Sequence, residues 1–216
     1  MPDPTSPNPE APRLVPPPRT YAHMVARWCI LPLVRTPVTP NHLTTLRLIS
    51  GLGAAVLFAL GGPFWTVWGG VVFAVSAVLD RADGELARVS GRISKGGHWF
   101  DLVSDMVVNV ATFLGIGIGL ADRFAGPWGP ILGALAGLSV GATFIVVFLV
   151  HTGGSHPSVA FSYPSRFDFD DALFLIAVAA WFNALLPLLY AAAIGAPLFL
   201  AFALWRYWRL KAPSAP

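Results

Sequence analysis

Four aspartates, Asp80, Asp83, Asp101 and Asp105, lie within or beside apolar stretches of this 216-residue chain. An ionised carboxylate at the centre of a bilayer costs at least about 2.5 kcal/mol, and less near the interface. The members of the first pair are three residues apart and those of the second are four apart, so each pair lies on one face of a helix. The short link at 89–96 makes the two helices antiparallel neighbours, which can bring both pairs together. Four converging acids repel one another unless cations intervene, which predicts a metal site.

The ligand chemistry of this cluster favours hard divalent ions. The cluster contains no cysteine, and its nearest histidine, His98, is not at ligand spacing with another histidine. Carboxylate oxygens suit Mg²⁺ or Mn²⁺, with Ca²⁺ as an alternative. Two carboxylate pairs suit two ions, an arrangement that neutralises a pyrophosphate and its leaving group. Small residues at Gly84 and Ala87 leave room for a ligand beside these acids, and Arg88 supplies a cation for a phosphorylated substrate.

The residues from Asp80 to Asp105 resemble the signature of the CDP-alcohol phosphotransferase, or CDP-alcohol phosphatidyltransferase, family. Its pattern, D-x2-D-G-x2-A-R-x8-G-x3-D-x3-D, is matched at every fixed position. The resemblance implies that Asp80, Asp83 and Asp101 are metal ligands. It also implies that Asp105 completes the metal site and is the catalytic base that deprotonates the acceptor hydroxyl.

The same resemblance suggests a set of residues that contact the cytidine diphosphate. One group belongs to the signature and its link, and the other to Thr39-Pro40-Asn41-His-Leu-Thr44, which resembles the segment opening the first span of such proteins. The predicted contacts are Asn41, Thr44, Gly84, Ala87, Arg88 and Ser94. Arg166, in the polar loop at 151–168, is a candidate acceptor-binding residue.

The resemblance predicts an enzyme of phospholipid synthesis. It would transfer a phosphatidyl group from CDP-diacylglycerol to the hydroxyl of a polar alcohol and release CMP. The alternative within the family is transfer of a phosphoalcohol from a small CDP-alcohol to a lipid hydroxyl, because the signature does not separate the two branches. An alternative from another class is an ion- or proton-coupled transporter. Family resemblance also suggests a homodimer.

The composition predicts an all-α polytopic membrane protein. Hydrophobic residues make up 55% of the chain, charged residues 12%, and the mean hydropathy is +0.65. We expect a disordered proline-rich cytoplasmic tail at 1–20, an interfacial amphipathic helix at 21–37, and a six-helix transmembrane catalytic domain at 38–211. The expected spans are 42–60, 64 into the charged segment 80–88, 97–120, 130–150, 171–182 with a few further residues, and 188–208.

The distribution of cations orients these spans. Thirteen of the fourteen Lys and Arg residues fall on one side of a six-span model, and only Arg123 falls on the other. The positive-inside rule therefore puts the aspartates at the cytoplasmic face, in a membrane expected to be a bacterial inner membrane. The net charge of +3 requires no nucleic-acid partner, since anionic membrane lipids account for it.

Glycines recur every four residues along the expected fourth span. They form one smooth face that permits close helix approach, made up of Gly129, Gly133, Gly137 and Gly141. The partner of this face is either the third span of the same chain or a second subunit.

Overall fold

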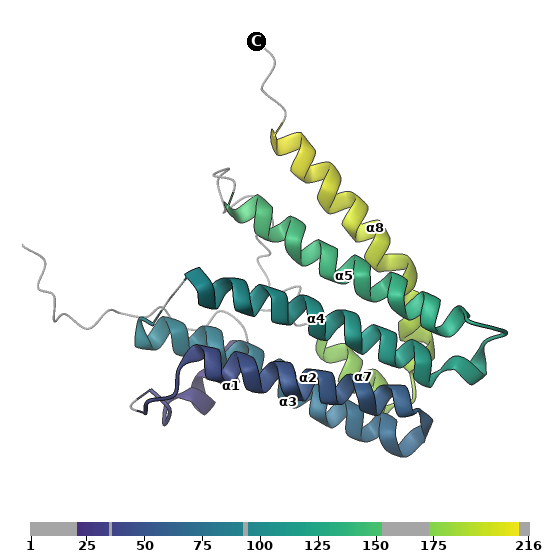
Figure 1. The fold of residues 1–216 in the computed structure, drawn as a ribbon, viewed down its shortest axis with the longest axis horizontal. Helices are drawn as coiled ribbons and strands as arrows, with labels where there is room; N and C mark the ends of the chain where they lie inside the picture. Colours follow the sequence, from purple (N-terminus) through teal and green to yellow (C-terminus); the bar gives the residue numbers. More distant parts are fainter. Residues whose placement is uncertain (1–20, 35, 93–94, 153–172, 212–216) are drawn as a thin grey trace, which may run out of the picture.

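The chain is all-helical throughout the residues that the computed structural model describes, which are 21–34, 36–92, 95–152 and 173–211 (Figure 1). The elements, in chain order, are α1 (Tyr21–Ile30), α2 (Pro40–Leu60), α3 (Gly62–Ser90), α4 (Lys95–Gly119), a short 3₁₀ helix η1 (Ala121–Arg123), α5 (Trp128–Thr152), α7 (Phe174–Trp181) and α8 (Leu185–Lys211). The predicted tail at 1–20 lies outside the described residues. The apolar core is formed where α2, α3, α4, α5, α7 and α8 pack together.

Five of these helices, α2, α3, α4, α5 and α8, are long and apolar enough to cross a membrane. The prediction of a polytopic helical membrane protein is therefore confirmed. The described part of the predicted fifth span is α7, whose eight residues extend about 12 Å against the roughly 30 Å of a bilayer core. Residues just before α7 are outside the described part of the chain, so the sixth crossing stays a prediction.

The helix boundaries follow turn-forming residues. Thr39 is the N-cap of α2, and its backbone N–H donates to Nδ1 of His42 at 3.3 Å. Asn41 lies in the first turn of the helix. Gly61 and Gly62 have φ of 67° and 76°, so the turn between α2 and α3 uses backbone conformations that suit glycine. The predicted break before the last span is confirmed at Asn183, whose φ is 54°.

The N-terminal helix α1 is shorter than the predicted helix at 21–37. It ends at Ile30, because Pro32 has no backbone N–H with which to continue the hydrogen-bond pattern. Ala26 and Ile30 are fully buried, in a cluster with residues of α2 and α3. The opposite face exposes Trp28, so α1 is amphipathic as predicted, and its position at the lipid interface stays a prediction.

The glycine face of α5 packs against α4 of the same chain. A Cβ atom added at Gly137 would lie 2.9 Å from Cα of Val110, and one added at Gly133 would overlap the carbonyl oxygen of Phe113. Gly129 faces Gly117 in the same way. The choice left open by the sequence is therefore decided in favour of the third span, because the two helix backbones are in direct contact.

Replacing Gly133 with Leu is expected to lower the stability of the protein by about 3 kcal/mol or more, because the new side chain would force α4 and α5 apart. The measurement is the thermal unfolding midpoint of the detergent-solubilised protein. Gly53→Leu is the matched control, since a Cβ atom at Gly53 has no neighbour within 4 Å. An equal loss of stability in both variants would contradict the packing argument.

Asp101 and Arg123 lie near opposite ends of α4. Asp101 is in the second turn of the helix, whereas Arg123 belongs to η1, which follows its last residue, Gly119. At 1.5 Å per residue, Asp101 and Gly119 are separated by about 27 Å along the helix axis. The single cation predicted on the far side of the membrane therefore does lie far from the aspartates. That the aspartates face the cytoplasm stays a prediction.

Candidate metal and nucleotide site

Carboxylates from two helices converge at one end of the bundle. One oxygen each from Asp80 of α3 and from Asp101 and Asp105 of α4 lies within 4.8 Å of the others. The side chain of Asp101 is 37% exposed, and those of the other two are 17% exposed. The prediction that these two helices are direct neighbours is wrong, because α3 and α4 each pack against α2 rather than against each other. Their carboxylates nevertheless converge. We call these three residues the aspartate cluster.

The aspartate cluster fits a divalent cation. Oxygens that share a Mg²⁺ ion at about 2.1 Å each lie at most about 4.2 Å apart. The oxygens of the cluster therefore need to move by less than about 1 Å to share one ion. All three donors are carboxylates, the ligand type that Mg²⁺ and Mn²⁺ prefer. An aspartate cluster of the metal-binding type is therefore present, as predicted.

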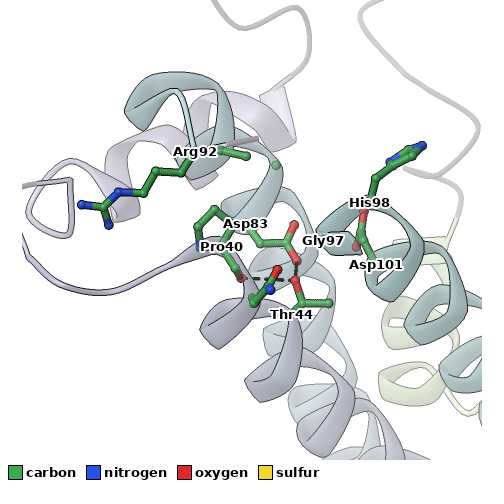
Figure 2. Close-up of a pocket in the computed structure, with 10 residues that line it drawn as sticks. Pro40, Thr44, Asp83, Arg92, Gly97, His98 and Asp101 are labelled. Carbon is green, nitrogen blue, oxygen red and sulfur yellow. Dashed lines mark hydrogen bonds between the residues drawn. The ribbon is translucent and has the colours of Figure 1, made fainter. Parts of the chain in front are cut away.

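Asp83 lies next to the cluster and makes a different contact. It is 3% exposed, and the Thr44 hydroxyl donates a hydrogen bond of 2.6 Å to its Oδ2 atom. Figure 2 shows the two side chains facing each other across the α2–α3 interface. Asp83 is not one of the three residues of the cluster, so its role as a metal ligand stays a prediction. Thr44, predicted as a nucleotide contact, holds this carboxylate in place.

The sequence-based reasoning missed Arg47 of α2, which had been treated only as one of the inside cations. Its side chain is 5% exposed and reaches all three residues of the cluster. Nε is 3.1 Å from Oδ1 of Asp80, Nη1 is 3.9 Å from Oδ1 of Asp101, and Nη2 contacts Oδ1 of Asp105. Two features of the sequence could have pointed to Arg47. It is a charged residue inside an apolar span, and it lies on the same helix face as Thr44, three residues earlier.

A cavity opens beside the aspartate cluster, between α2, α3 and α4 (Figure 2). Four of the predicted nucleotide contacts line it, namely Asn41, Thr44, Gly84 and Ala87, and the remaining lining residues are Pro40, Asp83, Arg92, Gly97, His98 and Asp101. A Cβ atom at Gly84 would meet only Nη2 of Arg88, at 3.8 Å. Within the described residues, therefore, no protein contact requires glycine at position 84. A glycine at this position is explained by the space that it leaves for a ligand.

Two arginines near this cavity have different partners, and the predicted nucleotide contact of Arg88 stays a prediction. Arg88 does not line the cavity, and its Nη2 atom pairs with Oε1 of Glu85 at 2.7 Å. Arg92, just beyond the C-cap of α3, does line the cavity, and its Nη1 atom donates to the carbonyl of Val38 at 3.2 Å. Figure 2 shows the Arg92 guanidinium directed away from Asp83. Ser94 and Arg166 lie outside the described residues, so their predicted roles stay predictions.

The model of the family described as CDP-alcohol phosphatidyltransferase matches residues 37–208, which include the bundle and the whole site. The chain belongs to this family. The family membership predicted from the resemblance to the signature is thereby confirmed, and the match does not support the transporter alternative.

Individual relatives agree with this assignment. The chain is 35% identical over 82 residues to archaetidylinositol phosphate synthase from Pyrococcus horikoshii, a match covering 38% of this chain and 42% of that protein. It is 33% identical over 86 residues to phosphatidylinositol phosphate synthase from Streptomyces avermitilis, covering 40% of this chain and 34% of that protein. The chain thus spans less than half the length of these curated relatives.

A solved structure shares the fold over nearly the whole chain. It is the crystal structure of Mycobacterium tuberculosis phosphatidylinositol phosphate synthase with CDP-DAG bound. The TM-score is 0.66 at 19% sequence identity, and the match covers 91% of this chain and 99% of that one. At this identity the likeness establishes the helical arrangement alone.

The Thr44 hydrogen bond leads to a prediction for this phosphatidyltransferase. Thr44→Val is expected to lower metal affinity or activity about 10- to 100-fold, because Asp83 loses the donor that orients its carboxylate. Thr44→Ser keeps a hydroxyl and is expected to stay close to the wild type. The measurement is the rate of CMP release as a function of Mg²⁺ concentration. Full activity in the Val variant would show that the hydrogen bond has no such role.

Proposed function

We propose that the protein transfers a phosphatidyl group from CDP-diacylglycerol to the hydroxyl of a polar alcohol and releases CMP. The observation that carries the proposal is that Asp101 belongs both to the aspartate cluster and to the wall of the cavity. A nucleotide seated in the cavity would place its pyrophosphate where the cavity meets the cluster. The bond to be broken would thus lie beside the carboxylates.

The helix termini around the cavity favour a phosphorylated ligand. Pro40 and Asn41 belong to the first turn of α2, and Gly97 and His98 to the first turn of α4. The positive ends of two helix dipoles therefore adjoin the cavity. Backbone N–H groups in such turns have no partner within their own helix and suit phosphate oxygens.

The chemistry can be written with the residues of this site. The acceptor hydroxyl oxygen would attack the phosphorus of the phosphatidyl group, and the bond from that phosphorus to the oxygen of CMP would break. Asp105 would accept the hydroxyl proton, and CMP would leave with the bridging oxygen. Asp105 is assigned this role by the family resemblance, and its place in the cluster outside the lining of the nucleotide cavity, which it shares with Asp80, is compatible with that role.

Asp80, Asp101 and Asp105, with Asp83 beside them, would hold the metal, which we propose to be two Mg²⁺ or Mn²⁺ ions. When bound, the ions would withdraw negative charge from the pyrophosphate. Asn41, Thr44, Gly84 and Ala87 would position the cytidine diphosphate, with Arg88 and Ser94 as further predicted contacts.

The names of the relatives suggest the class of acceptor. Two are inositol phosphate lipid synthases, and another, from Cereibacter sphaeroides, is a CDP-diacylglycerol–glycerol-3-phosphate 3-phosphatidyltransferase. We infer that the acceptor is a polyol, entering from the cytoplasmic side of a bacterial inner membrane, with Arg166 as a candidate contact. A homodimer is the proposed assembly.

The test is CMP release by the purified protein in detergent, with Mg²⁺ or Mn²⁺ present. One arm supplies CDP-diacylglycerol with inositol phosphate, glycerol 3-phosphate or serine, and the other supplies CDP-choline or CDP-ethanolamine with diacylglycerol. We expect CMP only in the first arm. Release only in the second arm would overturn the proposed donor and establish the reverse branch of the family.

A further inference from the structure

Arg47 brings a positive charge into the middle of the aspartate cluster. The side chain comes from α2, whereas the carboxylates belong to α3 and α4, so it joins three helices at one point. At 5% exposure its charge is little screened by water, so its interaction with these partly exposed carboxylates is stronger than that of a surface ion pair. Removing one partner of such a group leaves an uncompensated buried charge.

Two arginines of the described part of the chain, Arg47 and Arg81, contact the three carboxylates of the cluster. Arg81 pairs with Asp80, its neighbour in the sequence, whereas Arg47 reaches every member of the cluster. Glu85 and Arg88 form a separate pair further along α3. Arg47 is therefore the cation that holds the cluster together across helices.

We propose that Arg47 is the internal counter-ion of the aspartate cluster, and that its guanidinium competes with divalent cations for the oxygens of Asp80 and Asp105. This inference rests on the proposed metal site. Without metal, Arg47 holds the three carboxylates close despite their mutual repulsion. When a divalent ion binds, the guanidinium gives up part of its contact with the carboxylates.

The local geometry allows the side chain to move while α2 stays in place. The Ser76 hydroxyl donates a hydrogen bond of 2.9 Å to the backbone carbonyl of Arg47, which ties α2 to α3. A Cβ atom at Gly51, one turn later, would lie 2.5 Å from Cγ1 of Val108, so α2 and α4 are also in close contact. Nη1 of Arg47 makes no hydrogen bond within the described residues. The guanidinium therefore does not use all its donors where it lies, which reduces the cost of a shift.

The competition predicts opposite effects of one substitution on two measurable properties. Arg47→Gln removes the charge and keeps a polar side chain. The metal-free protein should become less stable, because three carboxylates then repel one another without their counter-ion. Mn²⁺ should bind about tenfold more tightly, since the ion no longer displaces a cation. Arg47→Lys keeps the charge and should stay close to the wild type in both respects.

The experiment uses the full chain in detergent. The thermal unfolding midpoint is measured in EDTA and in saturating Mn²⁺, and Mn²⁺ affinity is measured from the electron paramagnetic resonance signal of the free ion. Ser76→Ala is the matched control, because it weakens the same α2–α3 contact without changing charge. Its midpoint should fall by the same amount with and without Mn²⁺. The midpoint of Arg47→Gln should fall mainly in EDTA.

The outcomes separate this inference from the function on which it rests. If the wild type binds Mn²⁺ but Arg47→Gln binds it equally or less tightly, the competition is wrong and the proposed enzyme is unaffected. A midpoint that falls equally in EDTA and Mn²⁺ for Arg47→Gln would likewise reduce Arg47 to a packing role. If the wild type binds no Mn²⁺ and releases no CMP, the proposed metal site itself fails.

Discussion

Asp105→Asn is expected to lower the rate of CMP release by about 10³-fold or more, since a general base contributes about 10²- to 10⁴-fold and this residue also belongs to the metal cluster. Asparagine has nearly the same shape as aspartate but cannot accept the acceptor's proton. The substitution also removes one of the charges that a divalent cation would use. The measurement is the initial rate of CMP release at saturating donor and acceptor.

Asp122→Asn is the matched control for this prediction. Asp122 lies in η1, beyond the end of α4 that is far from the cluster, and it is exposed. The same chemical change there should leave CMP release unaltered. If Asp105→Asn kept nearly full activity, Asp105 would not be the base, and another carboxylate would have to accept the proton. Measuring Mn²⁺ binding by the same variant separates loss of the base from loss of the metal.

The arrangement of the aspartates could be predicted because their spacing in the sequence determines which of them share a helix face. Asp80 and Asp83 share a helix face, as do Asp101 and Asp105, and the short link keeps these two helices near each other although both pack against α2. The lengths of the apolar stretches likewise predicted the five long helices of the structure, and the break before the last of them lies near Asn183. These features depend on local pattern, which a single sequence contains.

The direction of long side chains could not be predicted in the same way. Arg88 lies in the last turn of α3 and Arg92 follows the C-cap Gly91, and the family signature implies that Arg88 contacts the nucleotide. In the structure Arg88 pairs with Glu85 and Arg92 lines the cavity, while the contact of Arg88 with the nucleotide stays a prediction. Arginine has several rotatable bonds, so its guanidinium follows the nearest available carboxylate or carbonyl rather than the face of its Cα atom.

The role of Arg47 depends on packing between distant segments. Nothing in the residues around Arg47 shows that α2 lies against both α3 and α4 at the depth of the aspartates. Ser76 and Gly51 create that contact, one by a hydrogen bond to the Arg47 carbonyl and the other by having no side chain. Similarly, the helix that contacts the α5 glycines is defined by the position of the α4 backbone, which the sequence does not give. Helix packing of this kind is set by pairs of elements.

Removal of divalent metal with EDTA is expected to abolish CMP release, and added Mg²⁺ or Mn²⁺ should restore it. The oxygens of Asp80, Asp101 and Asp105 are close enough to share an ion, and the donor pyrophosphate needs its charge neutralised before CMP can leave. EDTA should also lower the thermal midpoint, because ligand binding stabilises the folded state. The thermal shift on adding Mn²⁺ should be lost in Asp101→Asn but kept in Asp122→Asn. Undiminished CMP release after complete chelation would exclude a metal-dependent reaction and leave Arg47 as the charge that the aspartates require.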